Sequence, residues 1–320
     1  MKSLIAFSIA ALAMVTTAVR ADDKLTVGGG PVAEVPQFIV ANDRKLWGKA
    51  GLDVAVTPFA TGREAFEALM GGQLDLAIMA EFPAVVGAMR NQNFSVVAVL
   101  SRYKANRIIA KREQALKSVA ELAGAQIGVT IGTNSHFMLD EALKAAGVKA
   151  TIVNVAPPDI VPALGRGDIA AAAPFPSFYA GAKRALAGQY QELIVPAYET
   201  TMLLAASSSL IEKRPEALAK FLKALAEGQA VVDSEPAAAQ ETIARVMGGA
   251  TNLETIKAAW GDYEFKLTLD QKLADLLLRE GKWVRELGMI KNVEPTDAMF
   301  RGRLSAAALT SVLPSAVSLP

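Results

Sequence analysis

Short apolar runs alternate with segments of helical period along the first two thirds of the chain. The first run, 24–29, precedes a segment (36–51) in which apolar residues recur every three or four positions. The next run, 52–59, precedes a similar helical segment at 62–72. Strands that alternate with helices in this way build βαβ units. We therefore predict an α/β fold with mostly parallel sheets flanked by helices.

The alternation falls into two series followed by a helical region. The first series ends with the apolar run 94–103, and a second occupies residues 118–196. The segment 200–210 is then typical of one more strand, which could return to the first sheet. After Lys213 the pattern is almost entirely helical, and the segment 215–234 carries its apolar residues on one face. These helices would cover a sheet.

This order predicts two lobes. Residues 22–104 and 198–320 form the first lobe, and residues 105–197 form the second. The chain would cross between them near 103–112 and again near 196–201. No internal repeat or low-complexity linker interrupts either lobe.

The first 21 residues have the composition of a secretory signal peptide. Lys2 is followed by an apolar run from Leu4 to Val15, and Val19 and Ala21 place small residues before a cleavage site. The run is too short to span a bilayer. No cysteine follows it, so we expect no lipid anchor. The protein is therefore expected to be exported to the periplasm.

Composition excludes several functions. Removal of residues 1–21 leaves 31 basic and 32 acidic residues, so no charge excess would recruit nucleic acid or an anionic membrane. The absence of cysteine excludes disulfides and thiolate chemistry. With a single histidine, the usual zinc and copper sites are also excluded. We expect no metal and no cofactor, and we expect a monomer.

The single histidine, His136, is the first candidate for chemistry. A Ser-His-Asp hydrolase would need a G-x-S-x-G turn, which is absent, and Ser135 is adjacent to His136 on the same predicted helix turn. The glycine run that contains Gly30 follows a strand but lacks the spacing of a dinucleotide-binding loop. That run is either a flexible loop or a loop that lets a ligand approach the backbone.

Polar residues follow several predicted strands where helices begin. In open α/β sheets ligands bind at the carboxyl ends of the strands, and a helix start offers free N–H groups at the positive end of its dipole. Such starts contain Thr61, Gly62 and Arg63, then Glu81 and Phe82, and then Gly132, Thr133, Asn134 and Ser135. Two or three of them meeting in one cleft would form an anion site. Ordinary helix capping explains the same residues equally well.

The same loops, in the same order, resemble a known family. The segments FATGREAFEALMGGQLDLAIMAEFPAV, ALKSVAELAGAQIGVTIGTNSHFMLDEALKAAGV and VAPPDIVPALGRGDIAAAAPFPSFYA resemble the nitrate/sulfonate/taurine-type periplasmic binding proteins of ABC importers. Together these segments cover roughly half of the mature chain. The resemblance implies a type II periplasmic-binding-protein fold of two lobes, each a mostly parallel sheet flanked by helices, with two hinge crossings. It also implies a small-molecule ligand and an ABC-type membrane permease as partner.

The resemblance implies a set of cleft residues as well. By motif position these are Gly30, Thr61, Gly62, Arg63, Glu81, Phe82, Gly132, Thr133, Asn134, Ser135, His136 and Phe175. Where many members have an acidic residue after the aromatic one, this chain keeps Phe175 and has lost the carboxylate. Arg63 stands where a proline or a small residue is frequent.

These departures favour a ligand with an anionic head group, such as a sulfonate. Arg63 and the start around Thr133 would donate to the anion, His136 would tune the site, and Glu81 would orient a donor or meet an amine. Three alternatives remain. The cleft could bind a neutral or cationic heterocycle such as a thiamine-precursor pyrimidine, it could belong to a periplasmic enzyme, or the protein could report to a membrane sensor.

Overall fold

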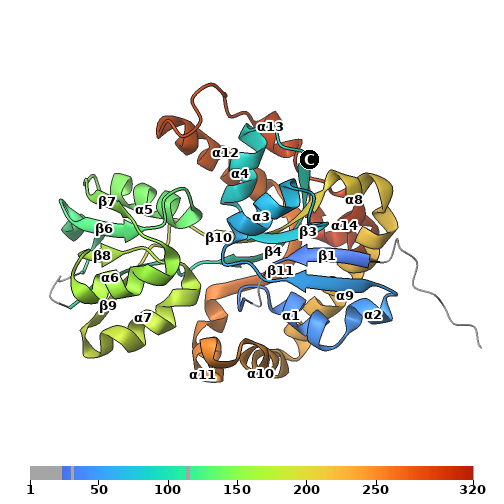
Figure 1. Cartoon of the computed structure of the whole chain (residues 1–320), viewed down its shortest axis with the longest axis horizontal. Helices are drawn as coiled ribbons and strands as arrows, with labels where there is room; N and C mark the ends of the chain where they lie inside the picture. Colours follow the sequence, from blue (N-terminus) through green and yellow to red (C-terminus); the bar gives the residue numbers. More distant parts are fainter. Residues whose placement is uncertain (1–23, 30–31, 113–115, 320) are drawn as a thin grey trace, which may run out of the picture.

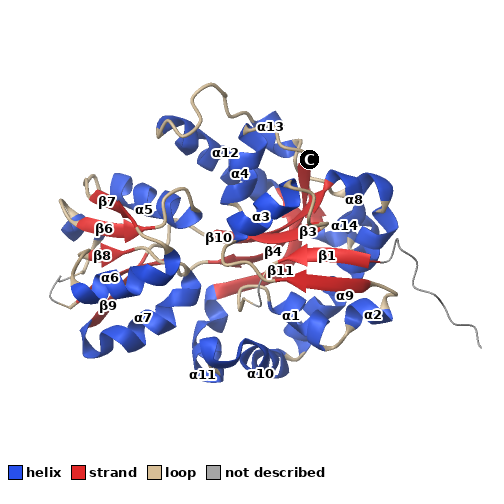
Figure 2. Cartoon of the chain, viewed as in Figure 1, coloured by secondary structure: helices blue, strands red, loops and turns tan. Residues whose placement is uncertain are grey.

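The protein folds into two α/β lobes, each built around one sheet (Figures 1 and 2). The computed structural model describes residues 24–29, 32–112 and 116–319. The predicted signal peptide, 1–21, and Gly30 lie outside the described residues. Within the described part of the chain, none of the helices combines the length and the apolar character needed to cross a bilayer.

The larger lobe contains a seven-stranded sheet in the order β12-β11-β4-β10-β3-β1-β2. Its strands are β1 (Lys24–Gly28), β2 (Asp53–Thr57), β3 (Leu76–Ala80), β4 (Phe94–Tyr103), β10 (Thr200–Ser207), β11 (Tyr263–Asp270) and β12 (Val317–Ser318). Strands β1, β2 and β3 pair in parallel, as the βαβ pattern predicts. Strand β10 returns to this sheet and pairs antiparallel with both β3 and β4.

Helices cover both faces of this sheet. The helices α3, α4, α12 and α13 lie on one side, and α1, α2, α9, α10 and α11 on the other (Figure 1). Their bounds, with those of α8 and α14, are α1 (Pro36–Asp43), α2 (Leu46–Lys49), α3 (Gly62–Met70), α4 (Phe82–Met89), α8 (Ser208–Lys213), α9 (Pro215–Ser234), α10 (Pro236–Met247), α11 (Leu253–Ala259), α12 (Gln271–Glu286), α13 (Asp297–Arg301) and α14 (Ala307–Val312).

Close packing of α1 on α9 anchors the lobe. The rings of Trp47 and Phe221 stack with their centroids 4.5 Å apart, and Phe38 lies against both. A Cβ atom at Gly228 would lie 2.4 Å from the backbone oxygen of Gln37, so only glycine permits this approach of the two helices. Because Glu34 and Val35 directly precede α1, this packing fixes the place of these two residues.

The smaller lobe contains a five-stranded sheet in the order β7-β6-β8-β5-β9. Its strands are β5 (Arg107–Lys111), β6 (Gln126–Val129), β7 (Thr151–Asn154), β8 (Ala171–Ala172) and β9 (Tyr190–Ile194), and its helices are α5 (Asn134–Ala145), α6 (Ile160–Arg166) and α7 (Tyr179–Leu186). Short 3₁₀ turns complete the described chain: Val119–Leu122, Pro157–Asp159, Pro176–Phe178, Ala187–Gln189, Gly248–Ala250, Trp260–Asp262 and Pro314–Ala316.

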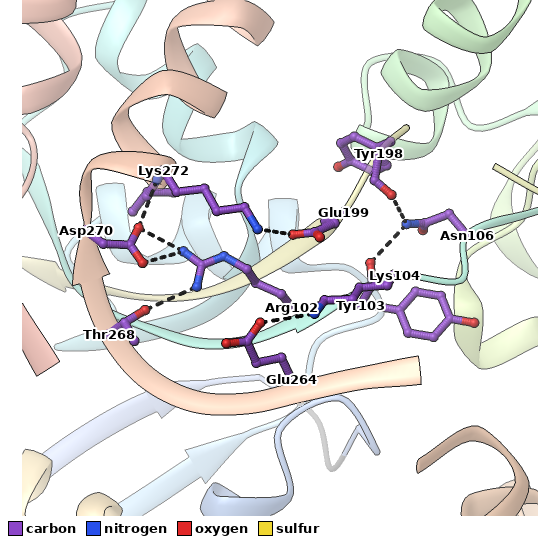
Figure 3. Close-up of polar contacts among 11 residues, drawn as sticks. Arg102, Tyr103, Lys104, Asn106, Tyr198, Glu199, Glu264, Thr268, Asp270 and Lys272 are labelled. Carbon is purple, nitrogen blue, oxygen red and sulfur yellow. Dashed lines mark hydrogen bonds and ion pairs between the residues drawn. The ribbon is translucent and has the colours of Figure 1, made fainter. Parts of the chain in front are cut away.

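Two adjacent connections join the lobes. Residues 104–106 link β4 to β5, and residues 195–199 link β9 to β10. The Asn106 side-chain amide donates to the backbone oxygens of Tyr103 and Tyr198, both at 3.2 Å, and so ties the two connections together (Figure 3). The Thr200 hydroxyl donates to the Asn106 side-chain oxygen at 2.8 Å. The two connections therefore form one narrow, hydrogen-bonded strap between the lobes.

Ion pairs hold this strap to the larger lobe. The Arg102 guanidinium binds both oxygens of Asp270 at 2.9 Å, and the side chain of Arg102 is only 5% exposed. Lys272 bonds Glu199 at 2.5 Å from the same part of β11 and α12 (Figure 3). One guanidinium nitrogen of Arg102, Nη2, donates to both carboxylate oxygens, and Nη1 donates to the Thr268 hydroxyl at 3.3 Å. The end of β4, where the first connection begins, is thus rigidly positioned.

Three predicted elements differ from the structure. The predicted helix 36–51 breaks after Asp43, because Lys45 adopts a left-handed backbone (φ 55°) and a separate short helix follows. The predicted crossing 103–112 is mostly strand β5, so only residues 104–106 connect the lobes. The region after Lys213 also contains β11, which pairs antiparallel with β4. The antiparallel pairs all involve β5, β10 or β11, and the other pairs are parallel.

Candidate ligand-binding site

A cavity of about 170 Å³ lies between the lobes. The loop after β1, the starts of α3 and α4 and the first residues of β10 line it from the larger lobe, and the start of α5 and the loop before α7 line it from the smaller one. The predicted site residues in its wall are Thr61, Gly62, Arg63, Phe82, Gly132, Thr133, Asn134 and Phe175. The parallel strands and their following helices thus bring distant loops to one place.

The start of α3 presents backbone donors to this cavity. The Thr61 hydroxyl accepts from the Glu64 N–H, and the Glu64 carboxylate accepts from the Thr61 N–H, which is a complete capping box. Thr61 therefore serves the helix itself. No described group accepts from the N–H groups of Gly62 and Arg63, which remain for a ligand.

The start of α5 presents a second set of donors from the other lobe. Gly132 has a φ of +74°, which favours glycine and turns the chain into the helix. Thr133 occupies the capping position, but its hydroxyl donates backwards to the Thr130 oxygen at 2.7 Å. The helix therefore has no side-chain cap, and the N–H groups of Asn134 and Ser135 stay unpaired among the described groups.

The rest of the wall is mainly apolar. Phe59, Phe82, Phe175 and Phe178 contribute aromatic rings from both lobes. Among the residues that the structure describes, Arg63 is the one cation of the wall; its side chain is 57% exposed and lies 3.7 Å from Glu67 on the same helix. A low local dielectric strengthens the attraction between helix starts and an anion. Because its side chain is more than half exposed, Arg63 lies at the rim of the cavity. The donors deeper in the cavity are backbone N–H groups.

Glu81 lies behind the cavity wall and not on it. It is fully buried; the Tyr198 hydroxyl donates to one of its oxygens, and the Thr201 N–H donates to the other at 2.8 Å. Burial raises the pKa of the Glu81 carboxyl, and these hydrogen bonds oppose the rise. The predicted contact of Glu81 with the ligand is thus replaced by a contact with the strap between the lobes. Glu81, directly after β3, is therefore paired within the chain, with Tyr198 and Thr201.

Ser135 and His136 are also placed away from the cavity wall. Both are buried, and His136 accepts from the Gly132 N–H at 3.4 Å while its ring meets Trp283 edge-on at 5.0 Å. Burial lowers the pKa of His136, and Asp140 partly opposes this. Thr133 and Asn134 of the same helix start line the cavity, whereas the His136 side chain lies against Trp283 of α12. His136 joins the lobes through this packing.

Glu34 and Tyr103 are among the wall residues that the sequence did not single out. Glu34 lies just before α1 and lines the cavity, and Tyr103 at the end of β4 lines it as well. Glu34 follows a predicted strand, as the other candidates do, so the same reasoning could have found it. The position of Tyr103 in the sequence, at the end of an apolar run, does not distinguish a cavity residue from a core aromatic. No group of three or more His, Cys, Asp or Glu side chains in the described chain could hold a metal ion.

Two α/β lobes, two adjacent connections and a cavity between them define the fold of the periplasmic binding proteins. The chain belongs to the NMT1/THI5 like family, whose pattern matches residues 33–239.

Relatives and solved structures carry names of binding proteins. A Brucella abortus (strain 2308) protein with the provisional name of a binding protein is 25% identical over an alignment of 262 positions, which covers 76% of this chain and 81% of that one. The taurine-binding periplasmic protein of Escherichia coli (strain K12) is 28% identical over 164 residues, half of each chain. The crystal structure of the periplasmic aliphatic sulphonate binding protein SsuA from Escherichia coli superposes with a TM-score of 0.76 at 21% identity, covering 88% and 92% of the two chains.

Proposed function

We propose that this protein is an exported solute-binding protein that captures a small organic anion, of the sulfonate type, and delivers it to an ABC importer. One observation carries the choice of ligand. Helix α3 belongs to the larger lobe and α5 to the smaller one. Both helices begin at the same apolar cavity, and each has unpaired N–H groups at its start. A sulfonate has three oxygens to accept from both starts and a carbon chain to lie against the aromatic wall.

The magnitudes support this assignment. A helix N-terminus contributes about 0.3–1 kcal/mol to an exposed anion and up to about 2 kcal/mol in a partly buried site. Hydrogen bonds to a charged group contribute about 1.5–3 kcal/mol each. Micromolar affinity corresponds to about 8 kcal/mol. Two helix starts with two or three hydrogen bonds give gross contributions of that order without a buried cation, and apolar contacts from Phe59 and Phe175 help to offset the entropy lost on association.

The position of the two helix starts suggests how binding changes the protein. A ligand held by α3 and α5 at once bridges the lobes, so it stabilises the closed arrangement. Residues 104–106 and 195–199 would be the hinge, because they are the two connections between the sheets. The membrane permease would then recognise the closed form. Export to the periplasm through the predicted signal peptide, 1–21, places the protein where such a permease takes up solute.

The proposal is tested by thermal unfolding of the chain from Asp22 onward with a panel of alkanesulfonates, carboxylates, nitrate, amines and pyrimidines. A ligand at 100 times its dissociation constant stabilises the native state by about 2.7 kcal/mol. We expect alkanesulfonates to raise the melting temperature. If a pyrimidine raises it and no anion does, the alternative of a heterocycle is correct and the sulfonate proposal is wrong. Turnover of a bound ligand into product would instead identify an enzyme.

A further inference from the structure

The lobes also touch at a place outside the strap, where α12 of the larger lobe meets α5 of the smaller one. Trp283 of α12 is the centre of this contact. Its indole N–H donates to a carboxylate oxygen of Asp140 at 2.6 Å. The centroid of its ring lies 5.0 Å from that of His136 and 5.3 Å from that of Phe137, both on α5. Trp283 is only 2% exposed, so side chains of both lobes enclose it.

Other residues extend this contact on both sides of Trp283. Lys144 of α5 lies 3.4 Å from Glu286 of α12. A Cβ atom at Gly132 would lie 3.5 Å from the Cε of Met289, so the chain after α12 reaches the start of α5. The contact between α5 and α12 therefore has a buried apolar centre, a hydrogen bond to a charged acceptor and an ion pair, which together resist separation.

Trp283 also lies against the wall of the binding cavity. The centroid of its ring is 5.6 Å from that of Phe82, which lines the cavity from the start of α4. Asn134, the first residue of α5, lines the cavity from the other lobe, and its side-chain amide donates to the Thr200 hydroxyl at 3.3 Å. One side chain of α12 thus supports elements of both lobes that form the cavity wall.

The opposite flank of the strap is open. A second cavity, of about 470 Å³, lies there between α7 of the smaller lobe and α11 of the larger one. In Figure 1, α5 and α12 lie on the upper side of the molecule, and α7 and α11 lie on the lower side. Among the described residues, no hydrogen bond or ion pair joins α7 to α11. The ion pair between Arg107 and Asp262, at 3.2 Å, lies at the strap itself, since Arg107 directly follows residues 104–106.

Charged side chains on the open flank favour its closure. Lys183 and Arg184 of α7 and Glu254 of α11 line the second cavity, and none of the three has an ionic partner among the described residues. Opposite charges on the two walls attract each other when α7 approaches α11. Because exposed ion pairs contribute little, they would close this flank without locking it. The two flanks of the strap thus differ in how firmly they hold the lobes.

We propose that Trp283 is a positioning residue that pins the smaller lobe to α12 on one flank, so that the lobes move by swinging α7 towards and away from α11. The start of α5 and Phe82 then keep a fixed separation, and this part of the binding cavity is formed before the ligand arrives. The side of the cavity towards α7 opens and closes. The inference goes beyond the proposed function, because it holds for a ligand of any chemistry.

The test measures one distance on each flank by double electron–electron resonance, in the chain from Asp22 onward and without ligand. The sequence contains no cysteine, so paired cysteine substitutions place the two spin labels unambiguously. Ala145→Cys with Lys282→Cys reports the separation of α5 and α12. Ala185→Cys with Lys257→Cys reports the separation of α7 and α11. All four positions are exposed.

We expect a single narrow distance distribution between α5 and α12, and a distribution at least about twice as wide between α7 and α11. Trp283→Leu removes the ring and its N–H, and it should widen the first distribution to about the width of the second. Trp47→Leu is the matched control. Trp47 is also buried, and it donates its indole N–H to Asn42 at 3.3 Å and stacks on Phe221, all within the larger lobe. It should leave both distributions unchanged.

Asp140→Ala tests the same contact with a smaller change. It keeps the Trp283 ring and removes the acceptor of its N–H, so it should widen the distribution between α5 and α12 by a smaller amount. The melting temperature of each variant shows whether the fold is retained. Equal widths on the two flanks of the labelled parent would contradict the inference. So would a distribution between α5 and α12 that stays narrow in the folded Trp283→Leu and Asp140→Ala variants.

Discussion

Alanine at position 62 is expected to weaken ligand binding at least about tenfold and to lower the free energy of unfolding by about 1–3 kcal/mol. Gly62 is the first residue of α3, where the helix start meets the cavity. A Cβ atom there would lie 2.8 Å from the Cα of Met79 and 2.9 Å from its Cβ. Because Met79 is a buried residue of β3, the sheet cannot yield, so α3 must move.

That movement changes the site directly. The unpaired N–H groups of Gly62 and Arg63 belong to the part of α3 that would be displaced. A hydrogen bond weakens steeply with distance and angle, so a shift of a fraction of an ångström reduces the attraction to an anion. Titration of the variant with an alkanesulfonate measures the loss, and a urea transition measures the stability.

Gly181→Ala is the matched control. Gly181 lies in the first turn of α7, and a Cβ atom there would meet nothing within 4 Å. Alanine in a helix is favoured over glycine by about 0.5–1 kcal/mol, so this variant should be as stable as the parent or slightly more stable. Equal affinities of Gly62→Ala and Gly181→Ala for the ligand would show that the α3 start does not form the site.

Glutamine at position 280 is expected to stabilise the protein at alkaline pH, with little effect at pH 4.5. Glu280 of α12 and Glu81 are both fully buried and adjacent to each other. Burial raises the pKa of both carboxyls, and the neighbouring charge of Glu81 raises that of Glu280 further. Glu81 already accepts from Tyr198 and Thr201, so the proton that the pair retains resides on Glu280.

The direction of the pH dependence follows from that proton. The folded protein keeps it, whereas the unfolded chain releases it above about pH 4.5. Stability that is present at pH 4.5 is therefore lost as the pH rises towards the folded-state pKa, at about 1.4 kcal/mol per pH unit. Glu280→Gln keeps a neutral donor beside Glu81 and should remove this loss. We expect it to be at least about 1 kcal/mol more stable than the parent at pH 8.

Urea transitions at pH 4.5, 6 and 8 for the parent and the variant measure this difference. His136, whose pKa is lowered, contributes stability of the opposite sign as the pH rises, but it is present in both proteins and cancels. The exposed Glu241→Gln on α10 serves as a control for the loss of one charge. A variant that is less stable than the parent at pH 8 would show that Glu280 is ionised and paired.

The periodicity of the chain was sufficient for most of the fold. The predicted helix 215–234 has the same bounds as α9, because a long amphipathic helix leaves little ambiguity. Strand β5 was missed because its five residues follow a connection at once, with no turn signal between them. Strand β11 does alternate, with Phe265, Leu267 and Leu269 on one face, but it is surrounded by helical segments. The left-handed backbone at Lys45 has no residue signature, since tertiary packing imposes it.

The candidate site was predictable as a set of loops but not as a set of side chains. The topology of parallel strands alone brings the starts of α3, α4 and α5 together. Which side chains at those starts face the cavity depends on partners far along the chain. Trp283 of α12 packs against His136, and Tyr198 donates to Glu81, so both candidates are held away from the ligand. The sequence alone could not show that these two residues lie away from the ligand, because it does not give the positions of Trp283 and Tyr198 in the fold.

The measurement that tests the central claim most directly is a calorimetric comparison of butane-1-sulfonate with butyl methyl sulfone. The two have nearly the same shape, but the sulfone has a methyl group in place of the anionic oxygen. If the starts of α3 and α5 bind an anionic head group, the sulfonate binds at one site with a dissociation constant of about 10 μM or lower, and the sulfone binds at least about tenfold more weakly. Equal affinities, or no binding of the sulfonate, would contradict the account.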